Sequence, residues 1–485
     1  MIDCKPFFWG GREEVLFMAE ENKTAQQKKK FDRMTKSSVK PLILKLAVPT
    51  ILSMLVSSFY NLADTFFVAM LKSDSATGAV GVVFALMAII QAIGFFFGQG
   101  SGNTVSRELG KQNVSEAEEM VSVGFFSALA VGVAILAIGL PLLEPLSVLL
   151  GSTETVKPYA MGYMKYILLA SPFMTSQLVL NNQLRFQGNA FFAMIGIVSG
   201  AVLNIGLDPL LIFVFDMGIE GAAIATAISQ CVSFVLLFVG VQKSDNLKIR
   251  LRNFKPKLKY YKAILNGGTP SLCRQGLASV ASICLNNIAG GYGDLALAAF
   301  TAVQKIMGFG ASALIGFGQG FQPVCGFNWG AAKYARVKEA FWFCIRVTAV
   351  FLAVVAVVGF VFAEPIVTSF CETDETVALA AKAMRAQLVV FPLLSWVVMS
   401  NMMLQNIGMV FKASVLAMAR QGLTFVPVVL ILPWLFELNG LVWSQPVADV
   451  LAFLIALPIQ ISVLRTINKA IREGGIIEKG KVVAR

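Results

Sequence analysis

The tetrapeptide FGQG occupies Phe97–Gly100 and returns at Phe317–Gly320, which sets an offset of 220 residues in a chain of 485. Earlier in each half the register slips by one residue, so that Pro49 pairs with Pro270. Glycine and proline fix the conformation of the backbone, so shared positions indicate a shared backbone path. The pattern predicts a tandem duplication of a unit of about 220 residues. The further pairs at this offset are Gly110 with Gly330, Glu119 with Glu339, Glu144–Pro145 with Glu364–Pro365, Pro172 with Pro392, and Gly188 with Gly408.

The composition predicts that each unit is embedded in a membrane. Hydrophobic residues make up 56% of the chain and charged residues 14%, and the mean hydropathy is +0.72. Apolar stretches long enough for a helix to cross a ~30 Å hydrocarbon layer recur along the whole length. Barrel strands would instead alternate polar and apolar residues over about ten positions. We therefore predict an all-α polytopic membrane protein with twelve transmembrane helices in two six-helix lobes. The expected spans are 42–71, 77–100, 120–143, 159–180, 190–214, 219–241, 263–289, 297–322, 339–363, 380–402, 413–434 and 440–464.

The distribution of Lys and Arg predicts the orientation. With the N-terminus inside, the inner segments carry 30 of the 40 basic residues, whereas the outer connections carry only Lys72 and Lys157. Because basic loops stay in the cytoplasm, both termini are expected there. Because each unit has an even number of spans, both units are expected to insert into the membrane with the same orientation. A pseudo-two-fold axis along the membrane normal should therefore relate them. The expected segments are a polar cytoplasmic tail (1–40), an N-lobe (41–241), a cytoplasmic linker (242–262), a C-lobe (263–464) and a second cytoplasmic tail (465–485).

Several functions lack the residues that they need. The chain has no GxxxxGK[ST] loop for ATP, no histidine for imidazole chemistry, and no GxSxG elbow in a plausible setting. The net charge of +12 fits the topological bias and anionic headgroups better than nucleic acid, because no basic soluble domain is present. We expect a protein that is not an enzyme, uses no cofactor, and draws energy from an ion gradient or a partner.

Acidic residues inside the spans are therefore informative, since an ionisable group there is costly and usually faces a cavity. Three of the 28 acids lie well within the spans, namely Asp64, Asp208 and Asp449. At 1.5 Å rise per residue, Asp64, Asp208 and Thr226 each lie roughly 10 Å below the outer edge. Tyr163 lies at a similar level, and Asn204 is one turn before Asp208 on the same helix face. The equal depths predict one cluster.

Two carboxylates, an amide and a hydroxyl suit a small hard cation or a shared proton. The alternative for Asp208 is to satisfy backbone groups freed by Pro209, and for Asp64 to bond a neighbouring asparagine. For Asp449, near Pro446, the structural role is favoured, because no matching acid is near in sequence. Tyr60, one turn before Asp64, is the expected wall of a substrate cavity.

Six stretches in order resemble the multidrug and toxic compound extrusion (MATE) family, in its bacterial MepA-like subgroup, and the resemblance covers about residues 38–465. The stretches are LAVPTILSMLVSSFYNLADTFFVA (46–69), SRELGKQN (106–113), LNIGLDPLLIF (203–213), LQNIGMVFKAS (404–414), ARQGLTFVPVVLILP (419–433) and WSQPVADVLAF (443–453).

The resemblance implies two six-helix lobes around a V-shaped cavity and export of organic cations in exchange for H⁺ or Na⁺. It implies a tyrosine beside the ion-coupling site, matched by Tyr163, and a cavity asparagine, matched by Asn181. No acid lies within 263–289 or 380–402, which departs from one pattern in the family and favours an N-lobe site. The ion-coupling residues that the family implies, which would also be the ligands of Na⁺, are Asp64, Asn204, Asp208 and Thr226.

The implied partners are small cationic drugs and the lipid bilayer, and the implied setting is a monomer in a bacterial inner (plasma) membrane.

Two rival functions stay open. A lipid-linked oligosaccharide flippase of the same superfamily would have about fourteen spans and a cationic cavity, for which Arg274, Lys305 and Arg420 are the supporting residues. A non-transporting scaffold or sensor would have no reason to bury paired acids.

Overall fold

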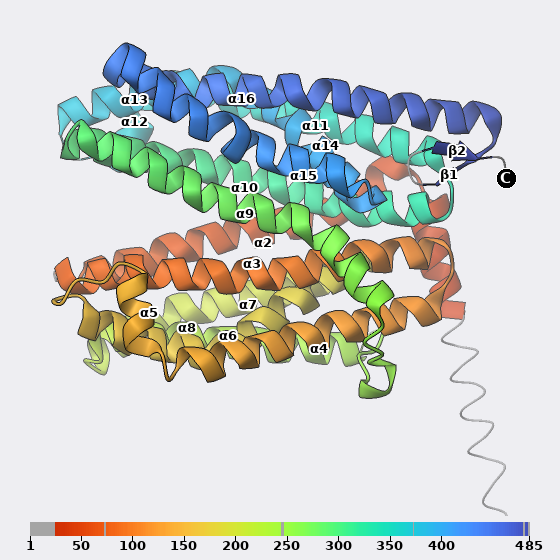
Figure 1. Cartoon of the computed structure of the whole chain (residues 1–485), viewed down its shortest axis with the longest axis horizontal. Coiled ribbons are helices and arrows are strands. Elements are labelled where there is room, and N and C mark those ends of the chain that lie inside the picture. Colours follow the sequence, from red (N-terminus) through yellow and green to blue (C-terminus); the bar gives the residue numbers. More distant parts are fainter. Residues whose placement is uncertain (1–24, 72–73, 244–246, 372, 479–480, 484–485) are drawn as a thin grey trace, which may run out of the picture.

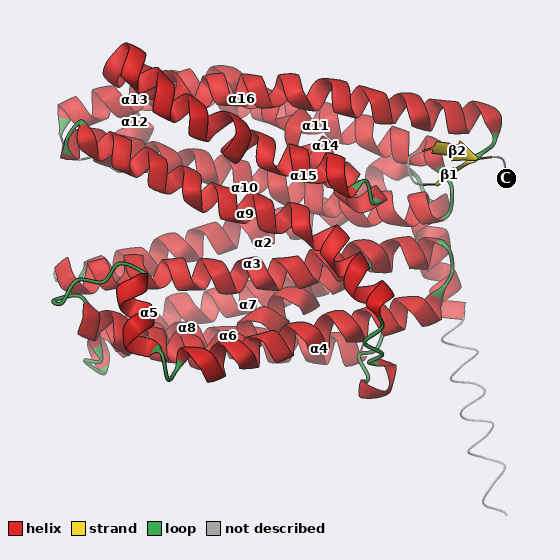
Figure 2. Ribbon diagram, in the orientation of Figure 1, coloured by secondary structure: helices red, strands yellow, loops and turns green. Residues whose placement is uncertain are grey.

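The computed structural model describes residues 25–71, 74–243, 247–371, 373–478 and 481–483, and this part of the chain is almost entirely helical (Figure 2). Residues 1–24 of the predicted tail and 244–246 of the predicted linker lie outside the described residues. The elements of the first half are α2 (Val39–Ala69), α3 (Asp74–Gly110), α4 (Val114–Gly139), α5 (Leu143–Leu149), α6 (Lys157–Phe186), α7 (Ala190–Pro209), the π-helix η1 (Leu210–Val214) and α8 (Gly218–Lys243).

A 3-10 turn, η2 (Leu251–Asn253), lies in the linker. The second half then repeats the order of long and short helices. Its elements are α9 (Leu258–Gly291), α10 (Asp294–Gly330), α11 (Tyr334–Val361), α12 (Ala363–Thr368), α13 (Asp374–Val390), the 3-10 turn η3 (Phe391–Leu393), α14 (Leu394–Ile407), α15 (Val410–Met418), the π-helix η4 (Ala419–Phe425) and α16 (Val426–Glu473).

Every predicted span coincides with a long helical segment. Nine segments among the described residues are long and apolar enough to cross a membrane, and one of them runs from Val410 to Glu473. This segment holds two crossings, because the backbone leaves helical geometry at Phe436 and Glu437. A Cβ added to Gly440 would lie 2.1 Å from the carbonyl oxygen of Leu432, so the chain folds back on itself there. The helices α6 and α9 supply the other two crossings and are more polar. The prediction of twelve transmembrane helices is confirmed.

The two halves share local structure as well as order. Asn181 Nδ2 donates to the Ala193 carbonyl at 3.0 Å, and 220 residues later Asn401 Nδ2 donates to the Ala413 carbonyl at 2.7 Å. The conserved offset extends to the helix ends: Gly188 follows α6 with φ +79°, and Gly408 ends α14 with φ +83°. Glycine takes this left-handed conformation without the strain that a Cβ would bring. The backbone path is therefore repeated.

Contacts between the lobes place the pseudo-symmetry axis. A Cβ on Gly110 would lie 3.0 Å from the Cα of Gly330, its own partner in the repeat. A residue that touches its repeat partner lies on the axis that relates the two. Nearby, Gly100 of α3 lies against Ile264 of α9, and Gly320 of α10 lies against Ala47 of α2. The first helix of each lobe thus packs on the second helix of the other lobe. Figure 1 shows α5 and α12 at one end of the molecule, so both lobes stand the same way up.

The end of the chain has more structure than the predicted cytoplasmic tail. α16 extends to Glu473, and a short antiparallel hairpin of β1 (Ile476–Glu478) and β2 (Lys481–Val483) follows it. The Ile477 amide donates to the Tyr334 hydroxyl at 2.9 Å, which ties the hairpin to the start of α11.

Replacing Gly330 by alanine should weaken the contact between the lobes. A Cβ at Gly330 would lie 2.1 Å from the Arg107 carbonyl oxygen, so the backbones must move apart. Overpacking of this kind costs about 1–3 kcal/mol, and thermal unfolding of the purified protein should report it. Gly276→Ala on α9 is the matched control, because its Cβ would meet nothing within 4 Å. Equal unfolding temperatures for Gly330→Ala and Gly276→Ala would contradict this packing.

Candidate functional site

The predicted N-lobe residues gather inside the bundle. Asn204 and Asp208 come from α7, Thr226 from α8 and Asp64 from α2. Asn204 Nδ2 donates to Asp208 Oδ1 at 3.2 Å and to Thr226 Oγ1 at 3.3 Å. The four-residue spacing on one helix face makes the first bond possible, and packing of α7 on α8 makes the second. Asp208 is fully buried and Asp64 is 4% exposed, so neither carboxylate is stabilised by bulk water.

Two tyrosines close the group. Tyr163 of α6 is fully buried. Tyr60 lies one turn before Asp64 on α2 and is half-buried. Its hydroxyl faces Gln230 of α8, a residue that the sequence analysis missed. Gln230 lies four residues after Thr226, so helical spacing from an expected site residue was the signal that could have found it.

Three acceptor atoms in this cluster have no donor. Asp64 Oδ1, Asp208 Oδ2 and Asn204 Oδ1 are buried and accept no hydrogen bond from any residue that the structure describes. A buried polar group without a partner costs about 1–3 kcal/mol, and more when it is charged. A proton on a carboxylate or a small cation would satisfy these oxygens. The cluster offers oxygen ligands from two carboxylates, an amide and a hydroxyl. No group of three His, Cys, Asp or Glu residues that could hold a metal ion occurs among the described residues. These residues fit H⁺ or Na⁺.

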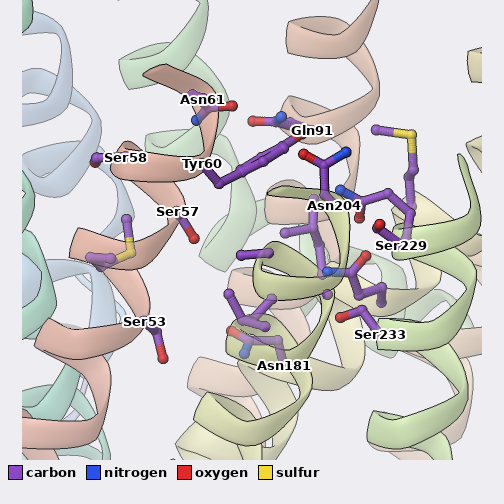
Figure 3. A pocket seen from close by; sticks show the side chains of 18 of the residues that line it. Ser53, Ser57, Ser58, Tyr60, Asn61, Gln91, Asn181, Asn204, Ser229 and Ser233 are labelled. Atoms are coloured by element: carbon purple, nitrogen blue, oxygen red, sulfur yellow. The ribbon is translucent and has the colours of Figure 1, made fainter. Parts of the chain in front are cut away.

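A cavity of about 210 Å³ opens beside the cluster. Tyr60, Asn204 and Thr226 belong to both the cluster and the cavity wall, and Asn181 also lines the wall. Figure 3 shows Tyr60, Asn181 and Asn204 at this cavity. The C-lobe contributes Gln319. Many of the lining residues carry a hydroxyl or an amide group, and apolar side chains such as Phe95 and Met174 line the rest of the wall. The cavity therefore offers apolar contact and neutral hydrogen-bond partners, and the nearby carboxylates are the charged element. The other side chains that line the cavity include Ser53, Ser57, Ser58, Asn61, Gln91, Ser229 and Ser233.

Among the described residues of the C-lobe, no matching acid cluster occurs. The repeat places Leu285 and Val428 where the N-lobe has Asp64 and Asp208. The buried carboxylate of Asp449 is neutralised instead: Arg420 Nε lies 2.9 Å from its Oδ1, and Gln445 Nε2 donates to the same oxygen at 3.0 Å. The sequence analysis named Asp449 and Arg420 separately and did not pair them. The residues that line the N-lobe cavity include neither Arg274 nor Lys305.

Twelve membrane helices in two lobes of the same orientation, with buried acids beside a polar cavity, define a solute transporter of the parallel-repeat class. The MatE family model matches residues 49–210 and 270–430, once in each half. The chain belongs to the MatE family.

Individual relatives agree with this assignment. A protein named Multidrug export protein MepA from Staphylococcus saprophyticus subsp. saprophyticus is 28% identical over 451 residues, which cover 90% of this chain and 97% of the relative. A protein of the same name from Staphylococcus aureus is 27% identical over 433 residues, covering 87% of this chain and 93% of the relative.

Solved structures share the fold closely. A crystal structure of MATE in complex with MaL6 has a TM-score of 0.86 at 25% identity, covering 90% of this chain and 99% of that chain. An outward-facing multidrug resistance MATE transporter of the MOP superfamily has a TM-score of 0.85 at 26% identity. The match covers 90% of this chain and 98% of that chain. A MOP superfamily transporter from Pyrococcus furiosus, described by the reverse polarity of its binding pocket, has a TM-score of 0.84 at 25% identity. The match covers 90% of this chain and 98% of that chain.

The Arg420–Asp449 pair gives a stability prediction. Arg420→Gln leaves the charge of Asp449 buried without its partner, and such a loss costs about 2–5 kcal/mol. The double variant Arg420→Gln/Asp449→Asn removes both charges and should recover most of that loss in thermal unfolding. If the double variant loses as much free energy of unfolding as the two single variants together, the two side chains do not interact as an ion pair.

Proposed function

We propose that the chain is a secondary active multidrug efflux antiporter that exports lipophilic organic cations in exchange for H⁺ or Na⁺ through the N-lobe carboxylates. One observation carries the proposal. Buried acceptors of Asp64 and Asp208 lack donors, and the cavity beside them shares Tyr60, Asn204 and Thr226 with the acid cluster. The ion and the drug therefore compete for one electrostatic environment. The relatives named multidrug export protein support the substrate class.

Competition of this kind is what antiport requires. Two unit charges ~8 Å apart interact by about 2 kcal/mol at an effective dielectric constant of about 20. That energy changes an affinity by roughly 30-fold. Loading Asp64 or Asp208 with H⁺ or Na⁺ removes the negative charge that attracts a cationic drug, so the ion releases the drug. By reciprocity, the bound drug expels the ion.

Helix α2 is the element that connects this exchange to the lobes. It carries Tyr60 and Asp64 and contains Pro49, a point where the helix can kink. On its other side, Thr50 Oγ1 donates to the Gly316 carbonyl at 2.6 Å, and Ser58 bonds Ser312 of α10 at 2.8 Å. A change of charge at Asp64 thus acts on a helix that also holds the contact with the C-lobe.

The proposed setting follows from the same reasoning. Both termini face the cytoplasm of a bacterial cell, the chain works in the plasma membrane as a monomer, and the substrates are small cationic drugs. The neutralised Arg420 supports this function over export of an anionic lipid-linked oligosaccharide, because it is not a free cation that could bind such a substrate.

Asp64→Asn and Asp208→Asn should each abolish gradient-driven drug export while expression stays intact. The amide keeps the volume of the side chain and cannot change its charge. Efflux of a fluorescent lipophilic cation from cells at matched protein level measures this. The double variant Arg420→Gln/Asp449→Asn is the matched control, since it removes a buried acid that has its own partner, and it should retain export. Full drug resistance with Asp208→Asn would contradict the N-lobe mechanism.

Purified protein in vesicles should export drug under an imposed pH gradient or an imposed Na⁺ gradient. One of the two gradients should suffice for the natural sequence, and neither should drive transport by Asp64→Asn. The gradient that works identifies the coupling ion. Transport that persists in Asp64→Asn under either gradient would place the coupling site elsewhere.

A further inference from the structure

A groove at the junction of the two lobes carries basic side chains. It has a volume of about 930 Å³ and lies where the start of α2 meets α11. Lys40 of α2 lines it together with Lys338 and Arg346 of α11, and Glu339 is the one acid among the described residues of its wall. Neither Lys40 nor Arg346 makes a hydrogen bond or an ion pair with any residue in the described ranges. The groove therefore has a net positive charge that the protein does not neutralise.

Arg346 lies inside a predicted transmembrane span. It is exposed and stands seven residues after the start of the span 339–363. Farther along the same face of α11, Val350, Val354 and Val357 are 64%, 58% and 65% exposed, which is typical of a surface in contact with acyl chains. A charged side chain beside such a surface is costly unless it has a partner. Arg346 leans toward the start of α11, so its partner should lie where the headgroups meet the acyl chains.

The N-lobe shows that a groove at this place takes an occupant. Two residues of the linker between the lobes cover the corresponding face of α4. Asn253 Nδ2 donates to Glu118 Oε2 at 3.5 Å, and the ring of Phe254 packs edge-on against Phe126 with 5.5 Å between centroids. At the repeat offset of 220, Glu118 and Phe126 correspond to Lys338 and Arg346.

In the C-lobe, the segment before α2 takes another path. Its carbonyl groups at Thr35 and Ser37 accept from Lys333 Nζ at 3.0 Å and from Arg336 Nη2 at 2.5 Å. Both donors lie around the start of α11. Within the described part of the chain, this segment therefore leaves the groove farther along α11 open, and the groove is lined by α2 and α11 alone.

The two grooves also have opposite charge. In the N-lobe the helix is acidic and its cover is basic: Glu119 of α4 pairs with Lys255 of the linker at 2.6 Å, and Glu116 pairs with Lys259 at 2.5 Å. In the C-lobe the wall itself is basic. Its occupant should therefore be an anion.

We propose that this groove binds one anionic phospholipid. The phosphate accepts from the three basic side chains, and an acyl chain lies along Val347 and Val350. Trp342, which also lines the groove, is a residue type that is enriched at the level of the headgroups. A lipid fits better than an acidic peptide, because the apolar end of the groove continues into the exposed valine face of α11. Basic pockets between membrane helices are typical sites for such headgroups.

The lipid would join the two lobes, since Lys40 belongs to the N-lobe and the other basic residues belong to the C-lobe. It stabilises the arrangement in which the start of α2 lies against α11, and it should raise the stability of the folded protein by mass action. The site is separate from Asp64 and Asp208 and does not depend on the proposed function.

Native mass spectrometry of the purified full-length protein tests the proposal. The protein in detergent is mixed with equal amounts of dioleoylphosphatidylglycerol, which is anionic, and dioleoylphosphatidylcholine, which has no net charge. Wild-type protein should retain one molecule of the anionic lipid with a preference of roughly ten-fold. Lys40→Gln/Arg346→Gln should retain the two lipids about equally. This double variant breaks no hydrogen bond or ion pair within the described ranges, so it should fold like the wild type.

Lys111→Gln/Lys469→Gln is the charge-matched control. Both lysine side chains are exposed, each is already paired with a glutamate, and neither lines the groove, so the lipid preference should be unchanged. Thermal unfolding gives a second readout. Phosphatidylglycerol should raise the unfolding temperature of the wild type and of the control by roughly 2–5 °C, and that of Lys40→Gln/Arg346→Gln should not respond.

Three results would overturn the proposal. The first is equal retention of the two lipids by wild-type protein, which would leave the groove to an acidic peptide. The second is an unchanged preference for the anionic lipid in Lys40→Gln/Arg346→Gln. The third is equal stabilisation by inorganic phosphate, which would show that the groove recognises the anion without the acyl chain.

Discussion

Inside a lipid bilayer each helix satisfies its own backbone groups, so only side chains remain to hold an ion. This constraint makes the unpaired oxygens of Asp64 and Asp208 the central feature of the molecule. Asp208 lies at the point where α7 gives way to the π-helix η1, and Pro209 removes one backbone donor there. Neither carboxylate forms an ion pair with a Lys or Arg of the described part of the chain, in contrast to Asp449. The N-lobe thus keeps two buried acids that have no basic partner among the described residues, whereas the buried Asp449 of the C-lobe is held in an ion pair with Arg420.

Duplication supplied the same scaffold twice, and the two copies diverged at their polar positions. The backbone repeats down to single hydrogen bonds, such as those of Asn181 and Asn401. The glycines at the axis keep the lobes in backbone contact, which only residues without a Cβ allow. When the two repeats are aligned, Leu285 and Val428 of the C-lobe stand at the positions of the N-lobe acids Asp64 and Asp208. Likewise, Arg185 of the N-lobe stands at the position of the neutral Gln405. In the antiport mechanism that we propose, this asymmetry lets one lobe carry the coupling ion while the other serves as its packing partner.

The sequence predicted the parts of the structure that depend on local pattern. The helical spans and the repeat follow from hydropathy and from the spacing of glycine and proline. The common depth of Asp64, Asp208 and Thr226 in the membrane stays a prediction. The contact of Arg420 with Asp449 was missed, because it joins two helices through one side-chain conformation at a π-helix. The C-terminal hairpin was missed as well, since its tie to Tyr334 bridges distant parts of the chain. Long-range packing of this kind leaves no periodic signal.

The central claim is that ion and drug compete at the N-lobe acids, and the most direct test counts ions on drug binding. Purified protein is titrated with a lipophilic cation while H⁺ release is followed by an indicator and loss of bound ²²Na⁺ is counted. The account predicts that H⁺ or Na⁺ is released in proportion to the bound drug. It also predicts that the affinity for the drug falls as the concentration of that ion is raised. Drug binding that releases neither ion and is insensitive to both would contradict it.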